Sequence, residues 1–220
     1  MRGAALARRL RLIVITEAEL AHPRSVEEVI AAALEAGAPA VQLRAKGATA
    51  RELLELGRRL RRLTRDAGAL LFVNDRVDVA LALGADGAHV GPDDLPVAAL
   101  RGAVPRGFLL GASADDPEVA ARLVADGADY IGCGTVYATT TKPDAGKIIG
   151  LEGLDRVARA VDAPVVGIGG ITPKRSAEVA RTGAAGVAVV GAVMGAEDPG
   201  EAVRALLEPW AGREGRGRRW

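Results

Sequence analysis

Short apolar runs recur along the chain, and each ends in a small cluster of polar residues. The run that begins at Val41 is typical, because it passes into Arg44 and Lys46. Runs of four to seven mainly apolar residues are characteristic of parallel strands that are buried on both faces. The pattern predicts eight strands, at residues 11–16, 40–46, 70–75, 87–91, 108–113, 130–136, 165–170 and 186–192.

Amphipathic segments separate these runs, and several of them end in a glycine just before the next strand. Ser25 followed by Glu28, and Asp198 followed by Pro199, are signals for the start of a helix. A glycine after the last turn is a common helix stop. The pattern predicts helices at residues 25–36, 49–67, 76–84, 95–102, 115–126, 151–161, 173–182 and 198–208.

Eight alternations of strand and helix, with no break in composition, predict a single (β/α)8 TIM barrel. We expect the barrel to span residues 1–211 and the Gly/Arg-rich tail, residues 212–220, to be disordered. An open doubly wound sheet is the structural alternative. It would need a glycine-rich first turn, which residues 16–18 do not supply.

Composition narrows the functional classes. The net charge of +1 argues against a nucleic acid or a membrane held by bulk electrostatics. The single cysteine, Cys133, excludes an internal disulfide and fits a reducing cytoplasm, where we expect the protein to act. No apolar run approaches the ~20 residues of a membrane span. The first twelve residues carry four arginines and no long apolar stretch, so we expect no signal peptide.

Polar side chains at the carboxyl ends of the predicted strands indicate a site that binds an anion. The carboxyl ends of barrel strands converge on one mouth, where barrel enzymes carry their chemistry. Alternation along a strand places Gln42, Arg44 and Lys46 on one face, which must be the inner face. A bound anion would compensate the two cations. The alternative is an internal ion pair with Asp75 or Asp94.

Asp75 and Asp94 follow neighbouring predicted strands and form a candidate metal site. Mg²⁺ takes one or two carboxylates and fills its other positions with water and phosphate oxygens. The alternative is helix capping, since both residues lie shortly before predicted helices.

The loop from Gly132 to Gly150 carries three consecutive threonines and then Lys142. Hydroxyl groups, backbone amides and a cation suit a phosphate, and a long loop can close as a lid. The last two strands end in glycine-rich segments that contain Gly170 and Gly191, where backbone amides can approach a phosphate.

The chain has two histidines. We interpret His89, inside the fourth predicted strand, as a histidine with satisfied hydrogen bonds, either in the core or behind the residues that contact the ligand. The sequence shows no Ser/His/Asp set, Cys/His pair or zinc-ligand spacing. We therefore expect chemistry that uses phosphates and a metal and needs no strong protein base.

Seven motifs, in order along nearly the whole chain, resemble those of the thiamine phosphate synthase family. They are Gln42-x-Arg44-x-Lys46, Asn74-Asp75, Gly91-Pro92-Asp93-Asp94, Gly111-Ala112-Ser113, Thr139-x-Thr141-Lys142, Gly167-Ile168-Gly169-Gly170-Ile171 and Val189-Val190-Gly191.

The resemblance implies a transferase of thiamine biosynthesis. It would join 4-amino-2-methyl-5-(diphosphooxymethyl)pyrimidine to 4-methyl-5-(2-phosphooxyethyl)thiazole and release diphosphate. Its partners would be these two small phosphorylated substrates, and a homo-oligomer is compatible with the sequence. Two alternatives remain: a thiazole tautomerase on the same barrel, which would need an acid/base group, and a barrel that binds a phosphorylated ligand without catalysis.

The resemblance also implies a role for each matched residue. Asp75 and Asp94 would hold Mg²⁺. The residues that would hold the pyrimidine diphosphate are Gln42, Arg44, Lys46, Asn74, Ser113 and Lys142, of which Arg44, Lys46, Ser113 and Lys142 would be catalytic. The thiazole phosphate would be held by Thr139, Thr140, Thr141, Gly170, Val190 and Gly191. Gly191 departs from the family, in which many members carry serine, and the lost hydroxyl would weaken the phosphate contact by ~1 kcal/mol.

Overall fold

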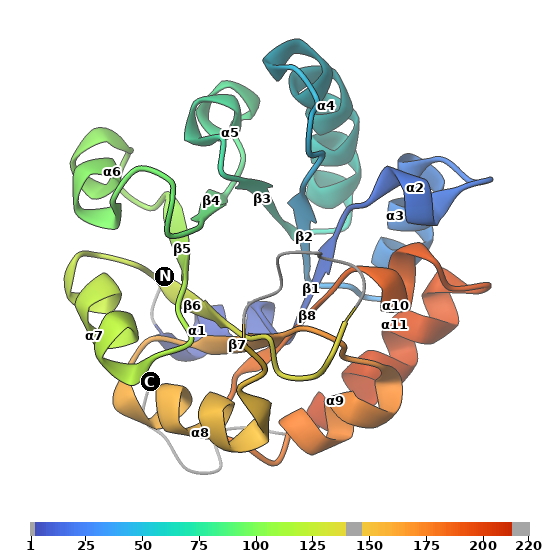
Figure 1. The fold of residues 1–220 in the computed structure, drawn as a ribbon. Coiled ribbons are helices and arrows are strands. Elements are labelled where there is room, and N and C mark those ends of the chain that lie inside the picture. The colour runs from blue at the N-terminus through green and yellow to red at the C-terminus, as the bar shows by residue number, and fades with distance from the viewer. Residues whose placement is uncertain (1–2, 140–146, 213–220) are drawn as a thin grey trace.

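Eight parallel strands close into a barrel in the order β1 to β8, and β8 pairs with β1 (Figure 1). The computed structural model describes residues 3–139 and 147–212. The strands are β1 (Leu12–Ile15), β2 (Ala40–Leu43), β3 (Leu70–Asn74), β4 (Gly87–Val90), β5 (Leu109–Ser113), β6 (Tyr130–Cys133), β7 (Val165–Ile168) and β8 (Gly186–Val189). The predicted barrel is confirmed, and the alternative of an open doubly wound sheet is wrong. The predicted disordered tail, residues 212–220, lies outside the described residues except for Gly212.

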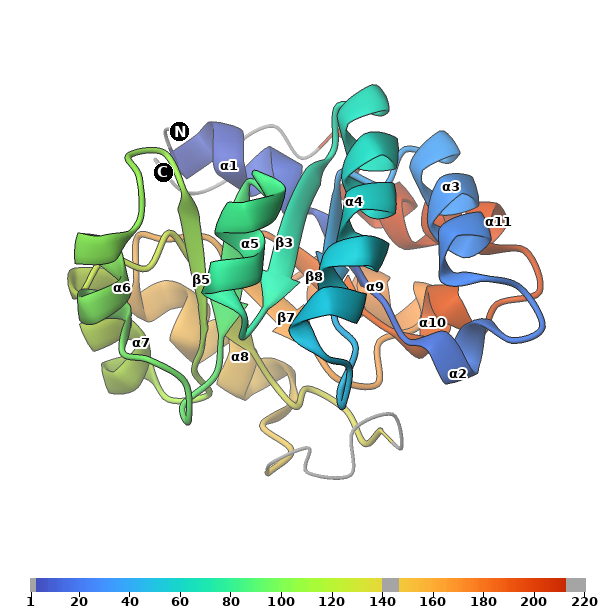
Figure 2. The same ribbon diagram turned by 90° about the horizontal axis from the view of Figure 1, so that it is seen from above.

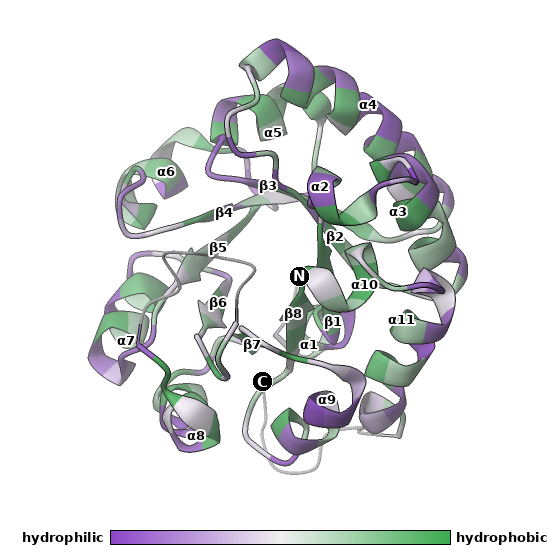
Figure 3. Cartoon of the chain, turned by 45° about the vertical axis from the view of Figure 1, so that its right-hand side comes forward, coloured by the Kyte–Doolittle hydropathy of each residue, from purple (hydrophilic) through white to green (hydrophobic). Residues whose placement is uncertain are grey.

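Helices surround the barrel and carry most of their hydrophilic surface on the outside (Figure 3). They are α1 (Gly3–Arg9), α2 (Ala18–Ala21), α3 (Val26–Glu35), α4 (Ala50–Asp66), α5 (Val77–Leu83), α6 (Val97–Ala103), α7 (Pro117–Ala125), α8 (Gly150–Ala160), α9 (Pro173–Val179), α10 (Gly191–Met194), α11 (Pro199–Leu207) and the 3-10 turn η1 (Glu208–Trp210). The two predicted start signals are confirmed, because Ser25 forms a capping box with Glu28 and Asp198 caps α11.

The structure differs from the sequence prediction at several ends and in its short helices. β2 ends at Leu43 and β8 at Val189, three residues before each predicted end. The patterns did not indicate α1, α2 or α10. Of these, α2 and α10 have four residues each, too few to show a helical period.

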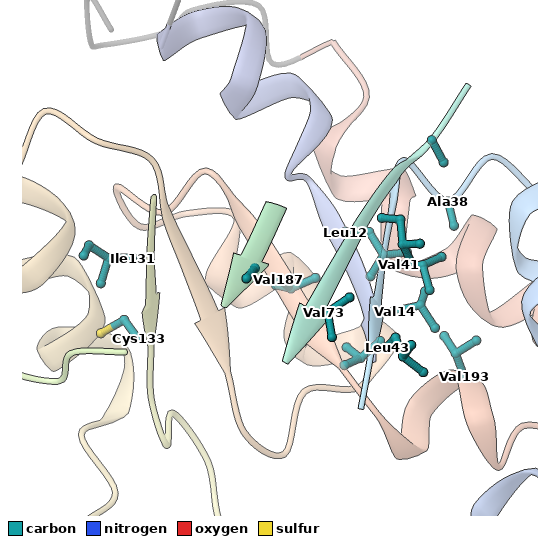
Figure 4. Close-up of a cluster of buried hydrophobic side chains, with 14 of the residues drawn as sticks. Leu12, Val14, Ala38, Val41, Leu43, Val73, Ile131, Cys133, Val187 and Val193 are labelled. Carbon is teal, nitrogen blue, oxygen red and sulfur yellow. The ribbon is translucent and has the colours of Figure 1, made fainter. Parts of the chain in front are cut away.

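Two apolar layers result from the alternation of side chains along the strands. Val41 and Leu43 of β2 point outward into the larger core between strands and helices (Figure 4). Ala40 points inward and packs in a smaller cluster with Phe72 and Tyr130 inside the barrel. The register extends this inner set, because Gln42 of β2 lies beside Phe72 of β3.

Helix α1 covers the end of the barrel away from the carboxyl ends of the strands (Figure 2). Leu6 of α1 and Leu10, just after it, are buried in the inner cluster. A side chain at Gly186 would overlap the backbone of Leu10, so glycine lets the chain pass close to β8 there. The inner cluster is therefore closed at this end, and the opposite mouth is left for ligands.

Within the described part of the chain, no helix combines the length and apolar character that crossing a membrane requires.

Candidate active site

Three predicted site residues lie on the inner face of the barrel, near its mouth. Gln42 is 4% exposed and belongs to the inner set of β2. Asn74 ends β3 beside His89 of β4, and Ser113 ends β5 beside Gly132 of β6. Ser113 is exposed, whereas Gln42 is buried. Closure of the barrel thus places these polar groups on its inner face, where Ser113 is exposed at the mouth.

Arg44 and Lys46 lie in the loop after β2, because this strand ends at Leu43. The prediction that strand alternation aligns them with Gln42 is therefore wrong. Thr16 holds the backbone of Arg44: its hydroxyl accepts from the amide N and donates to the carbonyl O, both at 2.8 Å. The Arg44 guanidinium pairs with Glu17 at 3.0 Å.

The ion pair of Arg44 with Glu17 bears on the alternative of an internal ion pair, for Arg44 alone. An internal pair of Arg44 with Asp75 or Asp94 is not formed, and the actual partner comes from the neighbouring strand end. The Arg44 side chain is 15% exposed. A half-buried cation held on one side by a carboxylate still has donors for an anion in the mouth. Lys46 is exposed in the same loop.

Asp75 and Asp94 follow neighbouring strands, and neither caps a helix. The N-cap of α5 is Arg76 and that of α6 is Pro96, and neither helix has a side-chain cap. Asp94 instead accepts a hydrogen bond from the Gly91 amide at 2.7 Å, within its own loop. The predicted alternative of helix capping is therefore wrong for both aspartates.

The backbone at Asp75 has a φ of 62°, a left-handed conformation that Asp and Asn tolerate better than most residues. Its amide donates to the His89 carbonyl at 2.8 Å and ties the end of β3 to β4. An unfavourable backbone conformation held by its surroundings is a recurrent feature of functional sites. The Asp75 side chain is consequently exposed at the mouth, near the end of β4.

The donor chemistry of these two carboxylates fits a magnesium ion. The described residues contain no group of three or more His, Cys, Asp or Glu placed to hold a metal. Mg²⁺ needs no such group, because it keeps several waters and binds through one or two carboxylates plus substrate phosphates.

The loops after β6 and β7 touch each other on the other side of the mouth. The Tyr137 amide donates to the Gly169 carbonyl at 3.1 Å. Gly170 has a φ of 61°, and a Cβ there would come within 2.5 Å of the Ala138 carbonyl oxygen. Glycine at position 170 therefore permits the approach that brings Thr139 close to the β7 loop. Thr140, Thr141 and Lys142 lie outside the described residues.

A cluster of side chains behind this contact was not predicted from the sequence. The Arg175 guanidinium lies 4.5 Å from the centre of the Tyr137 ring and donates to the Gly170 carbonyl at 2.6 Å. The Tyr137 hydroxyl donates to Glu178 at 2.8 Å. Burial and this carboxylate raise the pKa of Tyr137 to about 12, so the hydroxyl keeps its proton. The cluster fixes both loops. Its only sequence signal is a tyrosine, one of two in the chain, just before the threonine run.

His89 is hydrogen-bonded on both ring nitrogens, which confirms that it is a satisfied histidine. Its Nδ1 is 3.1 Å from the Tyr130 hydroxyl, and its Nε2 is 3.0 Å from Ser113 Oγ. Tyr130 is the second residue that the sequence did not single out. Its contact with His89 crosses from β6 to β4, which strand order along the chain does not indicate.

Comparison with known proteins agrees with this geometry. The family model described as thiamine monophosphate synthase matches residues 12–193. A thiamine-phosphate synthase of Roseiflexus castenholzii is 51% identical over 200 residues, covering 91% of this chain and 88% of that protein. One of Chloroflexus aurantiacus is 52% identical over 196 residues, covering 89% and 90%.

A solved structure resembles the whole fold. It is named thiamine phosphate pyrophosphorylase from Pyrococcus furiosus, and it matches with a TM-score of 0.85 and 46% sequence identity. The match covers 93% of this chain and 96% of that one. The closed eight-stranded barrel and the polar mouth agree with these matches. The chain belongs to the thiamine monophosphate synthase family.

Proposed function

We propose that the mouth of this barrel joins the diphosphorylated aminopyrimidine to the thiazole phosphate, making thiamine phosphate and diphosphate. The observation that carries the proposal is the set of anion-binding groups around one mouth: Gln42, Asn74 and Ser113 from inside, with Arg44 beside them. Together with family membership, this set favours a transferase that acts on small phosphorylated molecules.

The diphosphate of the pyrimidine substrate takes the side of the mouth formed by β2 to β5. Arg44 and Lys46 supply positive charge, and Ser113 supplies a hydroxyl donor. Asn74 and Gln42 supply amide groups from the inner face. Lys142, from the loop after β6, adds a third cation. Fixed donors that face developing negative charge lower the barrier to its formation.

Asp75 and Asp94 would hold Mg²⁺ at the ends of β3 and β4. When bound, the ion supplies positive charge that stabilises the departing diphosphate. The positive charges of Mg²⁺, Arg44 and Lys46 would together offset the negative charges of the two carboxylates and the diphosphate.

The thiazole phosphate takes the opposite side of the mouth. Gly170 lies there beside the segment that leads to Thr139, and Val190 and Gly191 follow β8. The first turn of a helix leaves its amides without partners inside the helix, so the amides at the start of α10 suit a phosphate. Thr139, Thr140 and Thr141 add hydroxyl groups from the adjoining loop.

The reaction balances without a protein base. The bond from the pyrimidine methylene carbon to oxygen breaks, and diphosphate leaves with its electron pair. The aminopyrimidine ring stabilises the cation that remains. The thiazole nitrogen then donates its lone pair to the carbon, and because this nitrogen carries no proton, none has to be removed. The described mouth offers cations and hydrogen-bond donors, which is what such a reaction requires.

We also propose that the protein acts in the cytoplasm. A place in the cytoplasm is supported by Cys133, whose thiol is buried and whose pKa burial raises to about 12, because such a thiol is inert and needs no oxidising compartment.

Single-turnover kinetics with two lysine variants test the proposal. We expect the unmodified protein to form thiamine phosphate, Lys142→Ala to slow the chemical step by about tenfold or more, and Lys174→Ala to leave it nearly unchanged. Lys174 is an exposed residue in the first turn of α9 and serves as the matched control. Failure of the unmodified protein to form product refutes the function. Equal effects of the two variants refute the role of Lys142.

A further inference from the structure

Four polar side chains form a line across the inside of the barrel and end at its mouth. The Gln42 amide lies close enough to the Tyr130 hydroxyl to lower the pKa of that group, against the larger effect of burial. This hydroxyl is 3.1 Å from His89 Nδ1, and His89 Nε2 is 3.0 Å from Ser113 Oγ. Gln42 and Tyr130 are 4% and 1% exposed, whereas Ser113 is exposed. The line therefore leads from the closed interior to a group that can touch a ligand.

Glycines at two positions in the barrel make room for the rings of Tyr130 and His89. A Cβ at Gly111 of β5 would overlap the Tyr130 ring. A Cβ at Gly132 of β6 would lie 2.8 Å from His89 Cε1. The Tyr130 ring also packs edge-on against Phe72, with 5.3 Å between the ring centres. Both rings are thus fixed by their surroundings, independently of the hydrogen bonds that they make.

The direction of the hydrogen bonds follows from the ligand end of the line. A phosphate oxygen only accepts, so a serine that binds it must donate its single hydroxyl proton outward. The Ser113 oxygen is then left to accept, and the donor at 3.0 Å is His89 Nε2. A neutral imidazole that carries its proton on Nε2 has an acceptor at Nδ1, which receives the proton of the Tyr130 hydroxyl.

The interior end of the line is compatible with the same direction. The Gln42 carboxamide can donate through its NH2 group to the oxygen of Tyr130. Burial raises the pKa of Tyr130 far above neutral, so its hydroxyl remains a donor toward His89. The opposite direction would turn the Ser113 proton toward His89, and the serine would then have nothing to donate to a diphosphate.

We propose that His89 is a positioning residue: held by Tyr130 as the neutral tautomer with the proton on Nε2, it fixes the Ser113 hydroxyl as a donor to the diphosphate. The inference rests on the proposed function, because the ligand of Ser113 sets the direction. A serine hydroxyl that already points at the leaving group needs no reorganisation as charge develops there. Loss of His89 should therefore lower kcat more than it raises KM for either substrate.

Nitrogen NMR of the histidines tests the tautomer without any reaction. The chain has only two histidines, and His22 lies exposed in the segment between α2 and α3. With 15N-labelled histidine, the variant His22→Gln leaves His89 as the one labelled ring. We expect a proton bonded to Nε2 and a bare Nδ1. A proton on Nδ1, in the presence or absence of inorganic diphosphate, overturns the proposal even if the enzyme is fully active.

Two substitutions separate positioning from packing. Glutamine places its amide nitrogen where His89 Nε2 lies and still donates to Ser113, whereas asparagine is shorter and reaches only the Nδ1 position. We expect His89→Asn to lower kcat by about tenfold or more, short of the ~100-fold or greater loss that removing a direct donor costs. His89→Gln should restore most of kcat, with both KM values nearly unchanged.

Equal losses in the two variants, no loss in either, or a change confined to KM would overturn the proposal. A protein that forms no product at all refutes the proposed function instead, and the NMR measurement still decides the direction of the hydrogen bonds. If either variant fails to fold, as shown by circular dichroism, the tautomer of the His22→Gln protein remains the deciding observation.

Discussion

At the scale of single residues, the backbone conformation of Asp75 allows a substitution that changes its charge without disturbing the fold. Asp75 is the one residue other than glycine with a positive φ among the residues that the structure describes. Asparagine tolerates this conformation as aspartate does, since both have short polar side chains. Exchange of Asp75 for Asn therefore keeps the turn and removes only the charge.

We expect Asp75→Asn and Asp94→Asn to lower turnover by at least about tenfold, because each removes a charged ligand of the proposed Mg²⁺. The midpoint of thermal unfolding should shift by no more than a few degrees. Steady-state kinetics across a magnesium titration, together with thermal unfolding, measure both effects.

The matched control is Asp162→Asn, which removes an exposed carboxylate just before β7. This strand end lies on the side of the barrel away from the mouth, so we expect unchanged turnover. Full activity of the unmodified protein in excess EDTA, or full activity of both site variants, would show that the reaction needs no metal at these carboxylates.

Gly191 gives a second prediction at this scale. It is the first residue of α10 and follows directly on the end of β8 and Val190. If backbone amides hold the thiazole phosphate there, Gly191→Ser should be tolerated, and its hydroxyl should tighten binding of this substrate by ~1 kcal/mol. The bulkier Gly191→Val should raise KM for the thiazole phosphate and leave KM for the pyrimidine diphosphate nearly unchanged.

The alternative is that Gly191 only eases packing between strand and helix. In that case the valine variant should unfold at lower temperature and lose affinity for both substrates alike. Substrate titrations on the folded variant decide between them, and parallel losses would place Gly191 outside the site.

At the scale of elements, two aspartates join strands to helices in the same way. Asp86, before β4, accepts from the Leu71 amide of β3 and from Arg61 of α4, both at 2.8 Å. Asp129, before β6, accepts from the Leu110 amide of β5 at 2.8 Å and from Arg101 of α6. Each aspartate thus fastens the start of its own strand to the amino end of the preceding strand, at the end of the barrel that serves stability.

We expect Asp86→Ala to reduce the free energy of unfolding by about 1–3 kcal/mol, since it leaves the Leu71 amide unpaired. Asp129→Ala should cost less, because Arg101 keeps the Gly127 and Phe108 carbonyls as partners. Arg61 has no such second acceptor for its guanidinium within the described chain, where its Nε is buried without a partner. Each 1 kcal/mol corresponds to ~2–4 °C in Tm for a chain of this size.

Thermal unfolding measures these losses, with kcat as the second readout. Turnover of both folded variants should equal that of the unmodified protein, because both aspartates lie away from the mouth. A reversed order of stability, or a loss of kcat at unchanged Tm, would contradict the assignment of this end to stability.

At the scale of the whole molecule, local signals predicted the elements but not the contacts that closure creates. Apolar runs and helix stops are local, so all eight strands were found. Helix α1 was missed because Leu6 has a place to pack only once the barrel leaves an open end. Strand ends are also set by the neighbours, which is why β2 stops at Leu43 and not at Lys46.

The site shows the same division. Polar residues at strand ends indicated which side chains belong to the mouth. Their partners were not predictable, because Glu17 meets Arg44 only where β1 and β2 adjoin, and Tyr130 meets Gln42 and His89 only across the closed barrel. Contacts between side chains of different strands, far apart in sequence, produce no repeating pattern along the chain from which they could be predicted.

A product assay shows whether this mouth condenses two phosphorylated heterocycles. The protein is incubated with both substrates and Mg²⁺, and all species are followed by mass spectrometry with separate measurement of diphosphate. We expect thiamine phosphate and diphosphate in equal amounts, with neither formed when one substrate is left out. An isomerised thiazole phosphate without coupling, or both substrates recovered unchanged, would contradict it.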